Sequence, residues 1–132
     1  MPLYGHELSL DTLPAQAGLG RTVNLAKQVD FVGRAASEAG PSADAPVLVG
    51  LVGDGKRAAR AGYPIYPDWE AQSGPIGVVT SGALSPTLGV PVAMAYLPPT
   101  FAQPGTEVAV DIRGTRSTYS VTPLPFYKRK RN

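Results

Sequence analysis

The sequence predicts a mainly β protein: a six-stranded antiparallel barrel of Greek-key-like order, preceded by a short mixed segment with one helix. Two observations support this prediction. Gly and Pro contribute 15 and 14 of the 132 residues and are spread along the chain, so they divide it into many short segments. Between them, apolar residues form short runs or alternate with polar ones, which is typical of strands. A hydrophobic content of 43% is enough for a packed core.

The first thirty residues are expected to form loops and short extended pieces. Gly18 and Gly20 discourage a regular helix around them, because glycine loses more backbone freedom than any other residue when it becomes helical. Val23 and Leu25 alternate with polar or small residues, which predicts a short strand over 21–27.

A short helix is predicted over 31–40. Three alanines favour it, and Gly40 followed by Pro41 ends it, because Gly suits the end of a helix and Pro cannot continue the hydrogen-bond ladder. Residues 41–46 contain only Pro, Ser, Ala and Asp, which is typical of a linker.

From residue 47 the pattern changes to strands. The run 47–52 is continuously apolar, as in a buried strand, and in 107–113 the residues Val108, Val110 and Ile112 share one face. Arg113-Gly114-Thr115 is expected to form a tight hairpin turn before the last strand. Closure of the strands into a barrel would remove exposed edges. The six expected strands are 47–52, 62–65, 75–81, 91–97, 107–113 and 117–122.

Composition argues against several classes of function. The net charge is only +2 and much of the excess lies in the tail 128–131, so no basic face for nucleic acid is expected. The chain has no Cys, which rules out disulfides and thiolate zinc sites. No apolar run approaches the ~20 residues of a membrane span, and the N-terminus shows no signal-peptide pattern. A cytoplasmic protein that contacts neither membrane nor nucleic acid is predicted.

No catalytic or metal-binding residue is predicted. His6 is the only histidine and has no nearby nucleophile, so it is interpreted as structural or exposed. The segment Thr80-Ser81-Gly82 lacks the motifs of a nucleophile elbow or a phosphate loop. We interpret it as the end of a strand, with hydroxyls bonded to backbone groups and Gly82 at a turn that needs a positive φ.

Several stretches together resemble the glycine-cleavage T-protein family, in the family's order and spacing. The stretch 76–88 carries the family's most recognisable segment, and Asp30-Phe31-Val32-Gly33-Arg34 resembles its helix start. The resemblance covers almost the whole chain. The other matching stretches are 1–8, 14–20, 48–51, 61–64, 93–96, 104–108 and 124–127.

The resemblance implies a folate-dependent aminomethyltransferase. Members of this family take the aminomethyl group from the lipoyl arm of the H protein, pass its methylene carbon to tetrahydrofolate and release ammonia. Their earlier lobes hold folate and the reacting Asp, and their last lobe is a β-barrel. By this resemblance, residues 1–40 correspond to the incomplete tail of the folate-binding domain, 41–46 to a linker, 47–127 to the C-terminal barrel and 128–132 to a basic tail.

The resemblance also implies that this chain is the C-terminal part of the enzyme and is inactive alone, because the reacting Asp belongs to the preceding lobes. In the family, a side chain at the extreme C-terminus reaches back toward folate, which makes Arg131 or Arg129 the candidate cofactor-binding residue.

Two other functions stay open from the sequence. The chain could be a non-enzymatic interaction module that pairs in trans with a separate N-terminal piece. It could also be the C-terminal barrel of a related folate-dependent dimethylglycine or sarcosine oxidase.

Overall fold

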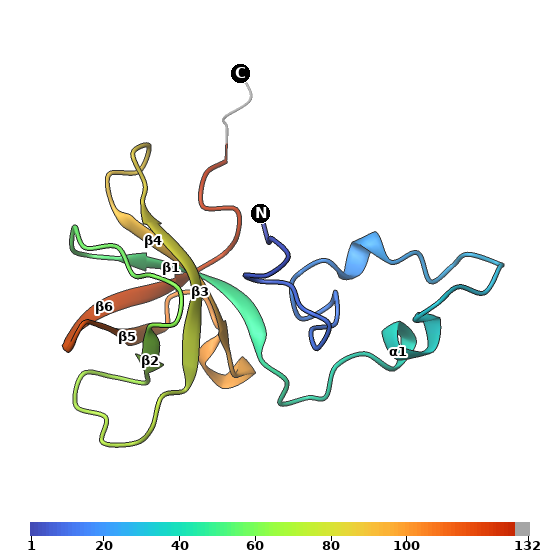
Figure 1. Ribbon diagram of the computed structural model, residues 1–132, viewed down its shortest axis with the longest axis horizontal. Helices are drawn as coiled ribbons and strands as arrows, with labels where there is room; N and C mark the ends of the chain where they lie inside the picture. The colour runs from blue at the N-terminus through green and yellow to red at the C-terminus, as the bar shows by residue number, and fades with distance from the viewer. Residues whose placement is uncertain (129–132) are drawn as a thin grey trace.

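Alternating apolar residues between residues 47 and 122 close into an antiparallel barrel, as Figure 1 shows in the computed structural model, which describes residues 1–128. Within these residues the barrel has six strands in the order β1-β4-β3-β2-β5-β6, and β6 pairs back with β1. The strands are β1 (Val47–Gly53), β2 (Pro64–Tyr66), β3 (Gly77–Leu84), β4 (Pro91–Leu97), β5 (Glu107–Ile112) and β6 (Thr115–Thr122).

The order of the strands confirms the predicted fold class. Strands β2, β3 and β4 follow one another as neighbours, while β1 lies beside β4 rather than beside β2, which is a Greek-key arrangement. The expected tight turn between the last two strands is present at Arg113 and Gly114, which have φ values of 55° and 85°. Positive φ at both central residues is typical of the type I′ turn, which matches the right-handed twist of the two strands that it joins.

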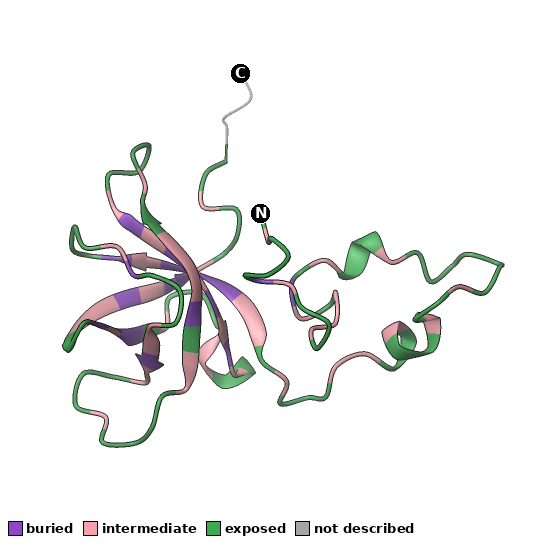
Figure 2. Ribbon diagram, viewed as in Figure 1, coloured by how far each residue is buried: buried purple, intermediate pink, exposed green. Residues whose placement is uncertain are grey.

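The core fills the inside of the barrel, and every strand contributes at least one buried residue to it (Figure 2). Leu51, Ile65 and Leu97 are fully buried there. Tyr119 closes the interior: its ring lies against Gly53, and its hydroxyl accepts from Ala59 N at 3.2 Å and donates to Arg57 O at 3.1 Å. These contacts satisfy a polar group that burial would otherwise penalise.

Residues 1–46, which we call the arm, extend from one side of the barrel (Figure 1). The arm contains a 3₁₀ turn, η1 (Gly20–Thr22), and one helix, α1 (Arg34–Ala39). A further 3₁₀ turn, η2 (Pro99–Phe101), lies between β4 and β5. The helix is shorter at its start than predicted, because Gly33 has a φ of 85°, outside the helical range.

The predicted strand over 21–27 is wrong: this segment consists of the 3₁₀ turn and irregular turns. Side chains form hydrogen bonds with backbone groups that, in a strand, would pair with a neighbouring strand. Asn24 Oδ1 accepts from Ala26 N at 3.1 Å, and the Arg34 guanidinium donates to Leu25 O at 3.0 Å and Lys27 O at 2.7 Å. Such local and tertiary bonds outweigh a weak alternation pattern.

Candidate functional site

The arm meets the barrel at Glu7, which is 2% exposed. It lies in a tight loop, in which the amides of His6, Glu7 and Leu8 all donate to Leu3 O at 3.0–3.2 Å. The Glu7 carboxylate accepts from Leu3 N through Oε2 at 3.0 Å, which closes the loop from its inner side.

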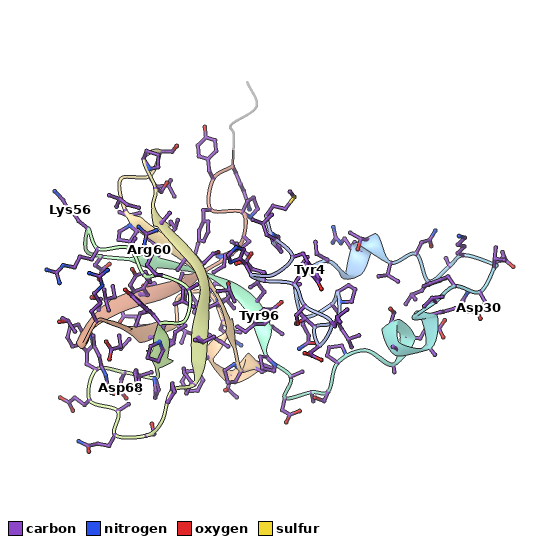
Figure 3. The ribbon with its side chains drawn as sticks, viewed as in Figure 1. Tyr4, Asp30, Lys56, Arg60, Asp68 and Tyr96 are labelled. Carbon is purple, nitrogen blue, oxygen red and sulfur yellow. The ribbon has the colours of Figure 1, made fainter. Side chains whose placement is uncertain are left out.

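The other carboxylate oxygen of Glu7 contacts the barrel. Thr80 on β3 donates its hydroxyl to Glu7 Oε1 at 2.8 Å, and Tyr96 on the neighbouring strand β4 donates its hydroxyl to Glu7 O at 2.7 Å. Both the side chain and the backbone of one arm residue are therefore held by the barrel. Figure 3 shows Tyr96 and Tyr4 on the two sides of this junction.

Two opposing effects act on the pKa of Glu7. Burial raises the pKa of the carboxyl, but hydrogen bonds from Ser81, Thr80 and the Leu3 amide, with the charge of His6, outweigh it and hold the pKa below the usual 4.5. The same burial acts on the other side of the junction, where desolvation raises the pKa of Tyr96. The geometry therefore favours a charged Glu7 and a neutral Tyr96 at neutral pH.

A second contact joins the arm to the start of the barrel. Leu48 N donates to Gln16 O at 2.8 Å, and Gln16 Nε2 donates to Pro46 O at 3.0 Å. The arm is thus attached both at its beginning, through Glu7, and at the strand that follows it.

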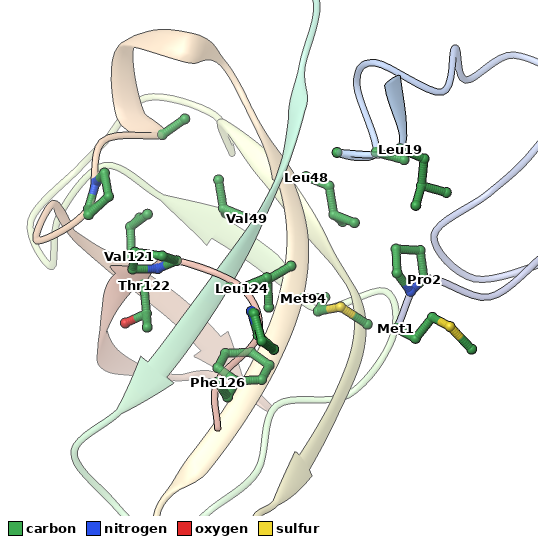
Figure 4. Close-up of a pocket in the computed structure, with 17 residues that line it drawn as sticks. Met1, Pro2, Leu19, Leu48, Val49, Met94, Val121, Thr122, Leu124 and Phe126 are labelled. Atoms are coloured by element: carbon green, nitrogen blue, oxygen red, sulfur yellow. The ribbon is translucent and has the colours of Figure 1, made fainter. Parts of the chain in front are cut away.

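A pocket of about 480 Å³ lies between the arm, the barrel and the segment after β6 (Figure 4). Met1, Pro2 and Leu19 of the arm form one wall. Side chains of the barrel, including Leu48 and Met94, and the segment 122–126 with Phe126 form the rest. Its mostly apolar lining suits an apolar group and provides no charged side chain among the residues that line it.

The segment Thr80-Ser81-Gly82 differs from its interpretation in two respects. It lies within β3, beside a register shift between Val79 and Ser81, and Gly82 has no positive φ. Gly82 is needed for space instead: a Cβ there would lie 2.3 Å from Ala59 O. The Thr80 hydroxyl lies 2.9 Å from the backbone carbonyl of Met94, as expected, but it also reaches the side chain of Glu7.

The other residues singled out in the sequence fall in different places. His6 lies in the arm loop and is exposed. Arg129 and Arg131, the candidate cofactor-binding residues, lie outside the described residues. Among residues 1–128 no three His, Cys, Asp or Glu side chains gather as a metal site would require.

Sequence reasoning missed Glu7 and Tyr96. Glu7 is a single carboxylate in an irregular loop, and its hydroxyl partner Thr80 lies 73 residues away. The one available signal was that Glu7, Thr80 and Tyr96 lie in stretches that resemble the same family, 1–8, 76–88 and 93–96.

The fold and the junction define a class of protein: a β-barrel module in which strand β3, part of the family-like stretch 76–88, binds the arm that precedes the barrel. Residues 47–128 match the family model of the glycine cleavage T-protein C-terminal barrel domain. The chain therefore belongs to this family, and the resemblance recognised in the sequence is confirmed.

Comparison with individual proteins agrees. The chain is 53% identical over 129 residues to an aminomethyltransferase of Cutibacterium acnes and 54% identical over 136 residues to one of Streptomyces coelicolor. These matches cover 98% and 99% of this chain but 34% and 36% of the relatives.

The fold is also that of a solved relative. The crystal structure of glycine cleavage system aminomethyltransferase T from Bartonella henselae matches with a TM-score of 0.82 and 34% identity, over 96% of this chain and 35% of that chain. The chain thus spans about a third of the length of the relatives it matches. None of the helices in the part of the chain described by the structure is long and apolar enough to cross a membrane.

Proposed function

We propose that this chain supplies the barrel end of an aminomethyltransferase of the glycine cleavage system. The enzyme transfers the methylene group from the aminomethyl-lipoyl H protein to tetrahydrofolate and releases ammonia in the cytoplasm. The observation that carries this proposal is the match of nearly the whole chain, at more than half identity, to two proteins named aminomethyltransferase. These names favour this function over that of a dimethylglycine or sarcosine oxidase.

On this proposal the chain is organised in four parts. Residues 1–40 are the tail of the folate-binding domain, 41–46 a linker, 47–127 the barrel and 128–132 a basic tail. The arm's irregular structure supports this organisation, because a segment that packs on a larger lobe needs little regular structure of its own.

We further propose that Arg131 or Arg129 contacts tetrahydrofolate. The segment 122–126 lines the apolar pocket, and the basic tail 128–132 begins two residues after it in the sequence. Guanidinium groups suit the carboxylates of a folate glutamate chain, because they bind carboxylates with two parallel hydrogen bonds.

The experiment measures ammonia released from aminomethylated H protein and tetrahydrofolate. We expect no release with this chain alone, because oriented reacting groups provide the rate and the relatives' preceding two thirds are proposed to hold them. Release is expected when the preceding two thirds of the Cutibacterium acnes relative are joined to this chain, and Arg131→Gln with Arg129→Gln should raise the KM for tetrahydrofolate. Turnover by the 132-residue chain alone would contradict the proposal.

One observation favours a second function, that of an interaction module that pairs in trans with an N-terminal piece. The arm exposes apolar side chains that the barrel does not cover: Tyr4 is 74% and Leu10 93% exposed. Exposed apolar groups gathered on one segment are typical of a docking surface.

Size-exclusion chromatography distinguishes the two functions. The chain is mixed with the separately produced N-terminal two thirds of the same relative. A joint peak at micromolar concentration without turnover supports the interaction module, and a joint peak with ammonia release supports the enzyme. Separate elution contradicts pairing in trans.

A further inference from the structure

Among residues 1–128, Glu7 is the charged side chain that is buried, and the groups that hydrogen-bond to its carboxylate are neutral. A buried carboxylate without a cation is costly unless hydrogen bonds replace its hydration. Here the backbone amide of Leu3 donates to Glu7 Oε2 at 3.0 Å, and the side-chain hydroxyl of Thr80 donates to Glu7 Oε1 at 2.8 Å. These bonds fix the position of the carboxylate relative to both the arm loop and β3.

The Thr80 hydroxyl has two acceptors within reach but only one proton. Glu7 Oε1 lies 2.8 Å and Met94 O 2.9 Å from Thr80 Oγ1. Neither acceptor can donate, and the charged carboxylate makes the stronger hydrogen bond, so the hydroxyl proton points to Glu7. A glutamine could donate its amide to Thr80, whose hydroxyl would then turn to Met94 O, while its oxygen still accepts from Leu3 N.

The barrel therefore holds the arm loop from two neighbouring strands. Thr80 on β3 fixes the side chain of Glu7, and Tyr96 on β4 fixes its carbonyl. In the same loop, Tyr4, which Figure 3 labels, and His6 are exposed. The position of these two exposed side chains relative to the barrel depends on the bonds that Glu7 makes.

We propose that Glu7 is a positioning residue, which fixes the loop 3–8 on strand β3 through Thr80. Its role is to keep Tyr4 and His6 in one orientation toward the lobe that precedes the barrel. This role rests on the proposed function only for the identity of that lobe. The fixed loop itself is a property of this chain.

Hydrogen exchange of the 132-residue chain tests this assignment. The amides of residues 3–8 are compared with those of β1 and β4 in Glu7→Ala and Thr80→Val. We expect exchange in the loop to become about tenfold faster in both variants, while the strand amides stay unchanged, because each variant removes a hydrogen bond to a charged group.

Conservative variants separate positioning from a general loss of stability. Glu7→Gln and Thr80→Ser should keep loop exchange within about twofold of the original, since both retain a hydrogen bond across the junction. Glu107→Ala, which removes an exposed carboxylate from the barrel, is the matched control and should change nothing.

Three results would overturn the proposal: unchanged loop exchange in Glu7→Ala or Thr80→Val, equal acceleration in loop and strands, or conservative variants that exchange as fast as the disruptive ones. If Glu7→Ala does not fold, Thr80→Val and Thr80→Ser still decide. The measurement needs neither folate nor H protein, so its failure is separate from a failure of the proposed enzyme.

Discussion

At the scale of single residues, hydrogen bonds to Glu7 link the stability of this protein to pH. The pKa of Glu7 is held below 4.5 in the folded chain, so the unfolded chain takes up the proton first as the pH falls. The carboxylate's contribution is thus fully present above 4.5 and is lost as the pH falls through the lower folded value. His6 and Tyr96 are the titratable side chains whose interactions reach this carboxyl.

We therefore expect the original chain to lose stability on acidification relative to Glu7→Gln. Urea unfolding of both proteins, from neutral pH to well below 4.5, gives the difference in free energy of unfolding at each pH. All other carboxyls cancel in this difference. A difference that stays constant with pH would show that Glu7 keeps an ordinary pKa.

Gly82 provides a second prediction at this scale. In Gly82→Ala the new Cβ would meet Ala59 O at 2.3 Å, and backbone cannot move aside as a flexible side chain can. We expect the free energy of unfolding to fall by about 1–3 kcal/mol, as for other overpacked sites.

The matched control is Gly74→Ala, where a Cβ meets nothing within 4 Å. It should stay within about 0.5 kcal/mol of the original, as surface substitutions do. Equal stabilities of the two variants in thermal or urea unfolding would contradict the close contact at Gly82.

At the scale of elements, the loop between β2 and β3 is built around Arg116 of β6. Its guanidinium lies 4.0 Å from the ring centre of Tyr66 and donates to the carbonyls of Asp68, Trp69 and Ala71 at 2.7–3.3 Å. Trp69 Nε1 also donates to Thr118 Oγ1 at 2.6 Å. The loop thus has a fixed path although it forms no strand.

Arg116→Lys should release this loop, because an ammonium cannot donate to three carbonyls while stacked on a ring. Trp69 is the single tryptophan, so its fluorescence reports on the loop alone. We expect a red-shifted emission with lower anisotropy. The control is Arg113→Lys, which loses one hydrogen bond to the Tyr63 hydroxyl. An unchanged Trp69 signal in Arg116→Lys would contradict the role of Arg116 in holding the loop.

Elements also show what the sequence could and could not predict. The last two strands were predictable because their alternation and the Arg113-Gly114 turn are local. The structure of the arm segment 21–27 was not predictable, because the guanidinium of Arg34, which lies outside this segment, donates to the carbonyls of Leu25 and Lys27. The same limit applies to the junction: Thr80 was singled out, but nothing near Glu7 in the sequence indicates burial.

At the scale of the whole molecule, the arm and the barrel differ in how well they cover their own apolar groups. The barrel interior is filled, whereas the arm exposes Leu10, Val29 and Val32. This difference is expected if the arm packs against another lobe of the proposed enzyme.

We expect the chain alone to bind a hydrophobic dye and to associate weakly as its concentration rises. Leu10→Asp with Val32→Asp should reduce both effects, because it places charges on the exposed apolar side chains. Leu88→Asp, at a 38% exposed position in the turn after β3, is the control. Dye fluorescence and analytical ultracentrifugation measure the change. Equal values for all variants would contradict association through the exposed apolar side chains of the arm.

The pairing of β1 with β6 has a consequence for how this chain is made. Gly50 of β1 lies beside Thr122 of β6, so the barrel cannot close until its last strand has been made and paired with its first. During synthesis β1 leaves the ribosome with both of its partners still to come, since β4 begins only at Pro91. A barrel closed through such distant partners folds slowly, and its nascent strands are exposed to aggregation until β6 arrives.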